Sequence, residues 1–252
     1  MLGAWSRLPE ATVDVVPDVA GTERGEHDFQ RPQASAGSGG GELMAPAQRT
    51  LFPTSAPETV THELAVDSLW ERVFTVAPLV IVGSKDADGT YDLAPKHMAT
   101  PLGWRGRYGF VCTPRHRTYR NIDRHGIFTV SFPRSVQVVQ TSLAASEREP
   151  DGTKPALEAL PTFPARKVEG VLVEGCYLFL ECELDRFVEL DDASLVIGRI
   201  VAASAVEGAI RNPDRDDADL LLHLAPLAYL SPSRFATVDR SQSFPFPSTF
   251  RR

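Results

Sequence analysis

The stretch from Leu93 to His125 decides the fold, and it reads LAPKHMATPLGWRGRYGFVCTPRHRTYRNIDRH. It holds seven full cations against a single carboxylate, Asp123, inside a chain of 252 residues whose formal net charge is −7. The cations are Lys96, Arg105, Arg107, Arg115, Arg117, Arg120 and Arg124. A local positive charge that opposes the sign of the whole chain indicates a binding site for an anion.

The residues among these cations narrow the kind of anion. Thr113 and Thr118 carry hydroxyl groups, and a short helix that begins at Thr118 adds unpaired backbone N–H groups at its start. Hydroxyls, arginines and a helix start are together typical of a phosphate site. The alternative is a solvated basic face on a loop and a short helix.

Apolar runs on both sides of this stretch predict β-strands. Short strands are expected at 79–84, 91–96, 107–112 and 127–132, and longer ones at 176–190 and 195–205. The turn 86–89 is rich in residues that tolerate positive φ, so it joins the first two strands into a hairpin. The short helix 118–125 takes Thr118 as its N-cap and ends at Gly126. Many short strands at hairpin spacing, with only short helices between them, predict a mainly β barrel with helical insertions.

Three further segments are expected to be helical or to pack against the barrel. The stretch 56–74 reads as an amphipathic helix at the entrance of the domain. The stretch 135–146 has a helical composition, and 154–160 forms one or two further turns. The tail from Leu227 is too aromatic for a disordered segment, so we expect it to pack along the domain or a partner subunit.

The chain divides into an N-terminal extension, 1–50, and a domain, 51–252. The extension contains the glycine-rich tract 37–41 and shows no helical or strand period, so we expect it to be disordered or not part of the natural protein. The residues Gly40-Gly41-Glu42 can be encoded by a purine-rich ribosome-binding sequence. Translation is therefore expected to begin at Met44, which a mass spectrum of the native N-terminus would test.

Composition excludes several classes of protein. The longest apolar run is strand-length and no secretory signal is visible, so we expect a cytoplasmic protein without a membrane partner. The net acidity argues against a nucleic-acid partner. Three cysteines without paired spacing argue against a disulfide framework, and the six histidines lack the spacing of metal ligands. No standard catalytic motif is present, so no catalytic side chain is assigned.

Four short motifs, in order along residues 76–230, resemble the flavin reductase-like group of the FMN-binding split barrels. That family has Asn-Leu-Ala-Pro-x-Ser where this chain has Asp92-Leu93-Ala94-Pro95-Lys96-His97. Its Lys-Asp-Thr-x-x-Asn-Ile segment corresponds to residues 116–122 here. Its apolar-Gly-x-Val strand corresponds to residues 196–200, and its Pro-Leu-x-Tyr-Leu segment to residues 226–230. Two departures stand out: Asp92 and His97 replace the asparagine and the serine of the first motif, and Arg117 replaces the aspartate of the second.

The resemblance implies an FMN-binding split β-barrel of Greek-key type with short helical insertions, and it assigns a cofactor site to two segments. The backbone of the first segment is expected beside the isoalloxazine ring and ribityl chain, and the second segment is expected to hold the flavin phosphate. The first segment comprises Ala94, Pro95, Lys96, His97 and Met98, and the second supplies Thr113, Arg115, Arg117 and Thr118. FMN is the expected cofactor, with FAD in its place as the alternative.

The family reading implies an NAD(P)H:flavin reductase, in which hydride passes from a nicotinamide to flavin N5. It also implies a homodimer, a small-molecule substrate and a monooxygenase that accepts the reduced flavin. Two alternatives stay open: an FMN enzyme that reduces a specific organic substrate, and an FMN-binding or storage protein without turnover. The cluster of Lys96, His97 and Trp104 near the expected ring motivates the first alternative.

Overall fold

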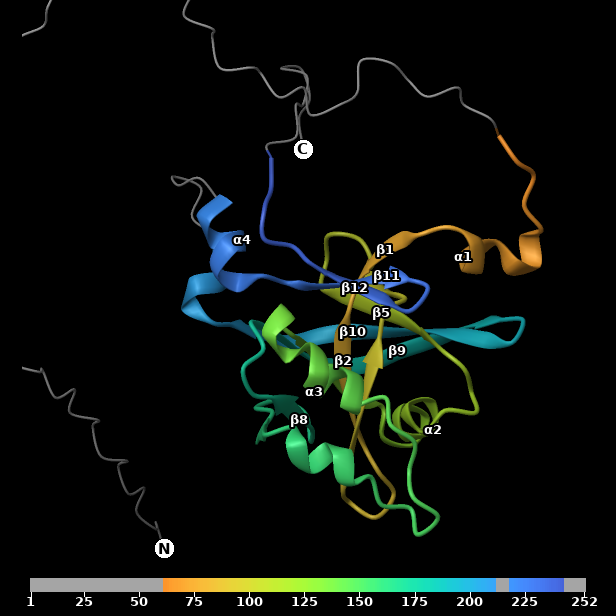
Figure 1. Cartoon of the computed structure of the whole chain (residues 1–252). Coiled ribbons are helices and arrows are strands. Elements are labelled where there is room, and N and C mark those ends of the chain that lie inside the picture. Colours follow the sequence, from red (N-terminus) through yellow and green to blue (C-terminus); the bar gives the residue numbers. More distant parts are fainter. Residues whose placement is uncertain (1–60, 212–217, 243–252) are drawn as a thin grey trace, which may run out of the picture. The chain divides into compact units, whose positions relative to one another are not determined.

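The protein is described by a computed structural model that covers residues 61–211 and 218–242, which belong to one folded unit. Its main element is an antiparallel seven-stranded sheet with the order β3-β2-β6-β9-β10-β5-β4, which curls into a half-barrel (Figure 1). The strands are β2 (Val80–Lys85), β3 (Tyr91–Lys96), β4 (Ala99–Pro101), β5 (Arg107–Cys112), β6 (Ile127–Phe132), β9 (Leu178–Leu190) and β10 (Ala193–Ala205). The split-barrel fold expected from the sequence is confirmed.

Successive side chains of a strand point to opposite faces of the sheet, and in β2 the side chains on both faces are buried. In β2, Val80 and Val82 enter one hydrophobic cluster, whereas Ile81 enters another. The first cluster fills the curl of the sheet and includes Phe110, Phe128 and other residues of β5, β6, β9, β10 and α2. A continuous apolar run in the sequence is therefore the signature of a strand that is covered on both sides.

The second cluster is covered by short elements that lie between β6 and β9 in the sequence. They are η2 (Ser135–Gln137), α3 (Val138–Leu143), η3 (Pro155–Ala159), β7 (Thr162–Pro164) and β8 (Val171–Val173). Their buried residues Leu160 and Leu172 pack with Ile81 and Leu93 of the main sheet. This layer matters for function because the loop between α3 and η3 lies against the hairpin β2–β3.

Helix α2 (Arg117–His125) packs on β2 and β3 (Figure 1), and it carries Arg117 and Thr118 of the second predicted segment. It ends at Gly126, whose φ of 67° is left-handed and suits glycine, as predicted. The predicted N-cap is wrong: the cap is His116, so the helix begins one residue earlier than expected. The Thr113 hydroxyl accepts a hydrogen bond from Arg115 N–H at 3.3 Å in the turn before the helix, and no side-chain cap is present.

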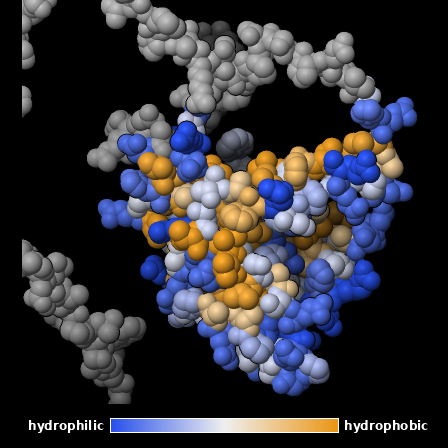
Figure 2. Space-filling view, in the orientation of Figure 1, coloured by the Kyte–Doolittle hydropathy of each residue, from blue (hydrophilic) through white to orange (hydrophobic). Residues whose placement is uncertain are grey.

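A second sheet contains the three antiparallel strands β1 (Thr75–Pro78), β11 (Leu227–Ser231) and β12 (Arg234–Thr237). The described part of the tail from Leu227 packs along the domain by pairing with β1, which is one of its two predicted placements. The segment before it contains η4 (Glu207–Ala209) and α4 (Ala218–Leu224). In Figure 2, apolar residues gather over the upper half of the visible face, where this second sheet lies.

The predicted helix 56–74 is wrong over its described part. Only η1 (Val66–Ser68) and α1 (Leu69–Arg72) form there, and Val73 is already extended. The apolar residues Leu64 and Trp70 are exposed, so an amphipathic helix would have no surface to cover. The predicted extension 1–50 and the proposed start at Met44 lie outside the described residues. None of the described helices has the length and apolar character needed to span a membrane.

Candidate functional site: two adjoining pockets at a sheet edge

The first pocket lies where β3 and β5 end, and we call it the strand-end pocket. Its volume is about 290 Å³. It is lined by Pro95, Lys96, His97, Met98, Val111, Cys112, Thr113, Arg115, His116, Asp192 and Ala193. Strand β3 is an edge strand of the main sheet, so its backbone pairs with β2 on one side only. The N–H groups that point away from β2 are available to a ligand.

The second pocket lies at the N-terminal end of α2, and we call it the helix-end pocket. Its volume is about 510 Å³. It is lined by Asp92, Ala94, Pro95, Lys96, Arg115, His116, Arg117, Thr118, Ala144, Ala145, Ser146, Glu147, Arg148 and Lys154. The first N–H groups of α2 face no acceptor within the helix, and their partial positive charge favours an anion at this end.

The nine residues predicted for the cofactor all line one or both pockets. The two pockets adjoin, because Pro95, Lys96, Arg115 and His116 line both of them. His97, Met98 and Thr113 belong to the strand-end pocket, whereas Ala94, Arg117 and Thr118 belong to the helix-end pocket. The structure thus brings together two segments that are separated in the sequence by the strands β4 and β5 and the turn between them.

Arg117 makes a contact that the sequence did not indicate. One of its guanidinium nitrogens, Nη1, lies 3.2 Å from Oδ1 of Asp86, a carboxylate that is almost fully buried. Asn121 donates to the same oxygen at 2.8 Å and to the Ser84 hydroxyl at 3.1 Å. Asn121 therefore orders this region from the buried side of α2, as expected for a residue that supports the loop rather than lines the site.

Sequence reasoning missed the loop after α3, which supplies Arg148 and Lys154 to the helix-end pocket. Lys154 donates to the carbonyls of Leu93 at 3.0 Å and Ala144 at 2.7 Å, so it joins β3 to the end of α3. Its burial lowers the pKa of the Lys154 ammonium, and Asp92 beside it opposes that shift. Nothing in the local sequence separates these two cations from ordinary surface residues, because their carboxylate partners, Asp86 and Asp92, are more than fifty residues away.

The pocket walls favour neutral imidazoles. Burial lowers the pKa of His97 below its ordinary 6.5, and the neighbouring Lys96 ammonium lowers it further. Burial, Lys96 and Arg115 lower the pKa of His116 in the same way. Cys112 lies 4.0 Å from Nδ1 of His116, and burial raises the pKa of its thiol, although Lys96 opposes the rise. The thiol is therefore protonated near neutral pH.

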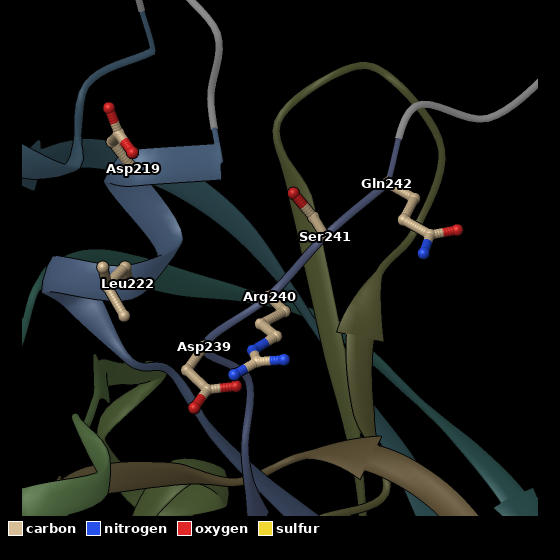
Figure 3. Close-up of a pocket in the computed structure, with 6 residues that line it drawn as sticks. All are labelled: Asp219, Leu222, Asp239, Arg240, Ser241 and Gln242. Carbon is tan, nitrogen blue, oxygen red and sulfur yellow. The ribbon is translucent and has the colours of Figure 1, made fainter. Parts of the chain in front are cut away.

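The surface of the described residues has two further hollows, one beside the strand-end pocket and one that shares no residue with either pocket. An apolar hollow of about 420 Å³ is lined by Trp70, Thr75, Ala77, His97, Met98 and Ser231, and so shares His97 and Met98 with the strand-end pocket. A hollow of about 600 Å³ lies between α4 and the segment after β12 (Figure 3). Asp219, Asp239 and Arg240 line it, but none of the predicted cofactor residues does. Over residues 61–211 and 218–242, no group of His, Cys, Asp and Glu is arranged to hold a metal ion.

The curled antiparallel sheet defines a split barrel, and a cation-rich pocket lies at its edge. Residues 73–236 match the family model described as the flavin reductase like domain. The chain belongs to this family, and the resemblance seen in the sequence is confirmed. Membership places the chain among the flavin-related oxidoreductases.

Solved structures with the same fold include three from bacteria. A flavoredoxin of Desulfovibrio vulgaris superposes with a TM-score of 0.61 at 22% identity, over 72% of this chain and 97% of its own. Nitrilotriacetate monooxygenase component B of Bacillus cereus superposes with a TM-score of 0.62 at 18% identity, and the match covers 76% of this chain and 100% of its own. A 2-nitrobenzoate 2-nitroreductase of Pseudomonas fluorescens superposes with a TM-score of 0.63 at 18% identity, and the match covers 76% of this chain and 99% of its own. At these identities the likeness concerns the fold.

Proposed function

We propose that the protein is an FMN-dependent oxidoreductase of the NAD(P)H:flavin reductase type. The observation that carries this proposal is the convergence of the nine predicted residues on two adjoining pockets, one rich in cations and one at a strand edge. Membership of the flavin reductase like family supports the same conclusion.

The helix-end pocket suits the phosphate of FMN. Lys96, Arg115 and Arg117 line it, and Thr118 lies in the first turn of α2 with its backbone N–H directed to the helix start. A phosphate dianion at this position would meet cations, a hydroxyl and the positive end of a helix. These are the groups that bind phosphate in water-exposed protein sites.

The strand-end pocket suits the isoalloxazine ring. An edge strand offers backbone N–H groups to the polar edge of the ring, while Pro95, Met98 and Val111 offer apolar surface to its faces. The two pockets share Lys96 and Arg115, so one FMN molecule could span both of them. When bound, the flavin supplies the redox chemistry by accepting hydride from a reduced nicotinamide and passing the electrons to an acceptor.

Because the bound flavin would supply the redox chemistry, the site needs no set of catalytic side chains. The protein residues bind, orient and shield the ring, and the neutral His97 at its expected border can donate or accept one hydrogen bond. Lys96, between the two pockets, balances negative charge on the bound cofactor. A protein acid or base is not required for the hydride step itself.

Spectroscopy and steady-state kinetics test the proposal together. We expect the purified protein to take up FMN and to show flavin absorption bands, and we expect it to oxidise NADH or NADPH when FMN is added in excess. Bound FMN with a background rate of oxidation would support the storage alternative. A colourless protein that takes up no FMN would overturn the proposal.

A second candidate function is the reduction of a specific organic substrate. The apolar hollow beside Trp70 favours it, because this hollow shares His97 and Met98 with the strand-end pocket. Its volume is in the range of small-molecule sites. FMN-dependent oxidation of NAD(P)H that rises with an added aromatic electron acceptor, rather than with free FMN, would favour this function.

We further propose that the protein acts in the cytoplasm as a homodimer and that it delivers reduced flavin to a monooxygenase. The exposed apolar residues Phe74, Val76 and Trp70 around β1 support the dimer, since their contact with a second copy would remove them from water. Similarity of fold to a monooxygenase component supports the flavin-accepting partner. Sedimentation of the full chain at equilibrium would test the dimer, and a monomeric mass would contradict it.

A further inference from the structure

Two buried carboxylates hold the cations of the helix-end pocket: Asp92 lines this pocket, and Asp86 contacts its lining residues Arg117 and Arg148. Asp86 follows β2 and is 1% exposed, and Asp92 lies in β3 and is 5% exposed. A buried carboxylate without partners is costly, so each must be neutralised by nearby cations or hydrogen-bond donors. The cations that do so come from α2 and from the loop after α3.

Asp86 joins two arginines that lie 31 residues apart in the sequence. Its Oδ1 lies 3.2 Å from Nη1 of Arg117, and its Oδ2 accepts a hydrogen bond from Nη2 of Arg148 at 2.9 Å. The side-chain amide of Asn121 also donates a hydrogen bond to Oδ1 of Asp86 at 2.8 Å. One rigid carboxylate thus fixes two guanidinium groups beside each other, at the wall of the same pocket.

Arg148 is held from three directions. Its Nη2 donates to Asp92 at 2.9 Å as well as to Asp86, and its Nη1 donates to the carbonyl of Gly152 at 2.7 Å. These contacts among the described residues occupy three of its five N–H donors, which leaves the Nε–H and one Nη1–H for a ligand. The corresponding contact of Arg117 occupies one donor, so four remain.

The charge of this cluster is not balanced by the protein. Arg117, Arg148 and Lys154 face the two carboxylates Asp86 and Asp92. Lys96 and Arg115 line the same pocket, where Glu147 is the other acidic residue. The pocket wall therefore keeps a positive excess, with preset guanidinium donors that match the geometry of a phosphate.

We propose that Arg148 and Arg117 together form the site for a phosphomonoester dianion, that of FMN, and that Asp86 is the positioning residue that holds both arginines in place. This inference rests on the proposed function and deepens it. It assigns a binding role to the loop after α3, and it explains why a buried aspartate lies beneath a phosphate pocket. The 2′-phosphate of NADPH has the same chemistry, and the experiment separates the two sources.

The experiment compares FMN with riboflavin, which has the same ring and ribityl chain but no phosphate. Dissociation constants are measured by quenching of flavin fluorescence for the full-length wild type and for Arg148→Met, Arg148→Lys and Asp86→Asn. Arg124→Gln is the control, because it removes one exposed cation at the other end of α2. Thermal unfolding of each variant reports whether it is folded.

We expect Arg148→Met to weaken FMN binding about ten- to a hundredfold while riboflavin binding changes less than about threefold. Arg148→Lys should recover part of the loss, because it restores the charge but not the paired donors. Asp86→Asn should also lower the preference for FMN over riboflavin, and it should add little in the Arg148→Met background because both changes disturb one interaction. Arg124→Gln should leave both constants unchanged.

Four results would overturn the inference. An equal loss of FMN and riboflavin binding in Arg148→Met would show a structural role for Arg148 rather than a phosphate contact. An unchanged FMN constant with a raised KM for NADPH, but not for NADH, would assign the site to the nicotinamide phosphate. If the wild type binds FMN and riboflavin equally well, the phosphate site is contradicted but the proposed function is not. If the wild type binds neither flavin, the proposed function is overturned as well.

Discussion

The rings of His97 and Tyr229 pack against each other in a tilted arrangement, with centroids 4.4 Å apart and an interplanar angle of 32°. His97 lies between β3 and β4 at the border of the strand-end pocket, and Tyr229 lies in β11 of the second sheet. This contact joins the wall of the candidate flavin site to a strand more than 130 residues later in the sequence. The second sheet thus supports the site, although it contributes no phosphate ligand.

The state of His97 should make stability depend on pH. Burial and the Lys96 ammonium lower its pKa, so the unfolded chain binds more protons than the folded one as the pH falls below about 6.5. Stability should therefore decrease as the pH falls through the unfolded pKa towards the lower, folded pKa. We expect His97→Gln to lose less stability than the wild type between pH 7 and pH 5 in urea unfolding.

His62→Gln is the matched control, because His62 is exposed near the start of the described residues. It should follow the wild-type profile over the same pH range. Identical profiles for His97→Gln and the wild type would show that the histidine does not titrate differently on folding.

Thr118→Val should weaken FMN binding and leave the fold intact. Valine has nearly the shape of threonine but lacks the hydroxyl group, which lies in the first turn of α2 and which we propose donates to the phosphate. We expect a loss on the order of 1–3 kcal/mol, or about five- to a hundredfold in the dissociation constant. Thr100→Val on exposed β4, away from both pockets, is the control. Equal affinities in the two variants would place the phosphate elsewhere.

Local sequence was sufficient for the parts of the structure that depend on neighbours in the chain. The strands around Val82 and Phe110 follow from apolar runs, and the helix stop at Gly126 follows from its backbone freedom. The two site segments came from the family resemblance; the structure brings their residues to two adjoining pockets, and their role in holding the cofactor stays a prediction. The strand bounds 91–96, 107–112 and 127–132 match the structure.

The parts that could not be predicted depend on contacts between distant segments. Asp86 reads as a turn residue, and only the folded chain shows that it neutralises Arg148, 62 residues later. Strand β1 contains Pro78 and pairs with a tail strand, so its local sequence gave no strand signal. The segment 56–74 shows the opposite case. Its local apolar pattern predicts a helix, but in the described part of the segment the apolar residues Leu64 and Trp70 are exposed and cover no surface of the fold.

Gly198→Ala should destabilise the protein through packing. A Cβ at Gly198 would lie 2.3 Å from the ring of Phe128 and 3.1 Å from Cβ of Cys182, both of which are buried. The ring also packs edge-to-face on Phe110 and cannot move freely. We expect a loss of about 1–3 kcal/mol in the free energy of unfolding. Gly208→Ala is the control, since a Cβ there meets nothing within 4 Å, and an equal effect of both changes would contradict the packing argument.

Lys154→Met should loosen the loop that carries Arg148. The Lys154 side chain is 6% exposed, donates to the carbonyls of Leu93 and Ala144, and lies 3.5 Å from Oδ1 of Asp92. Methionine fills the space of the aliphatic chain but leaves the two carbonyls without a donor and removes one cation from Asp92. We expect a loss of about 3 kcal/mol in the free energy of unfolding.

Hydrogen exchange locates this effect. Because Lys154 ties β3 to the end of α3, the amides of residues 144–154 should exchange faster in Lys154→Met, while those of β9 and β10 keep their protection. Lys167→Met removes an exposed lysine and should change neither the stability nor the exchange. FMN binding should weaken as well, because Arg148 loses the fixed loop from which it reaches the pocket. A stable variant with unchanged exchange in this loop would show that Asp86 and Asp92 hold Arg148 without help from Lys154.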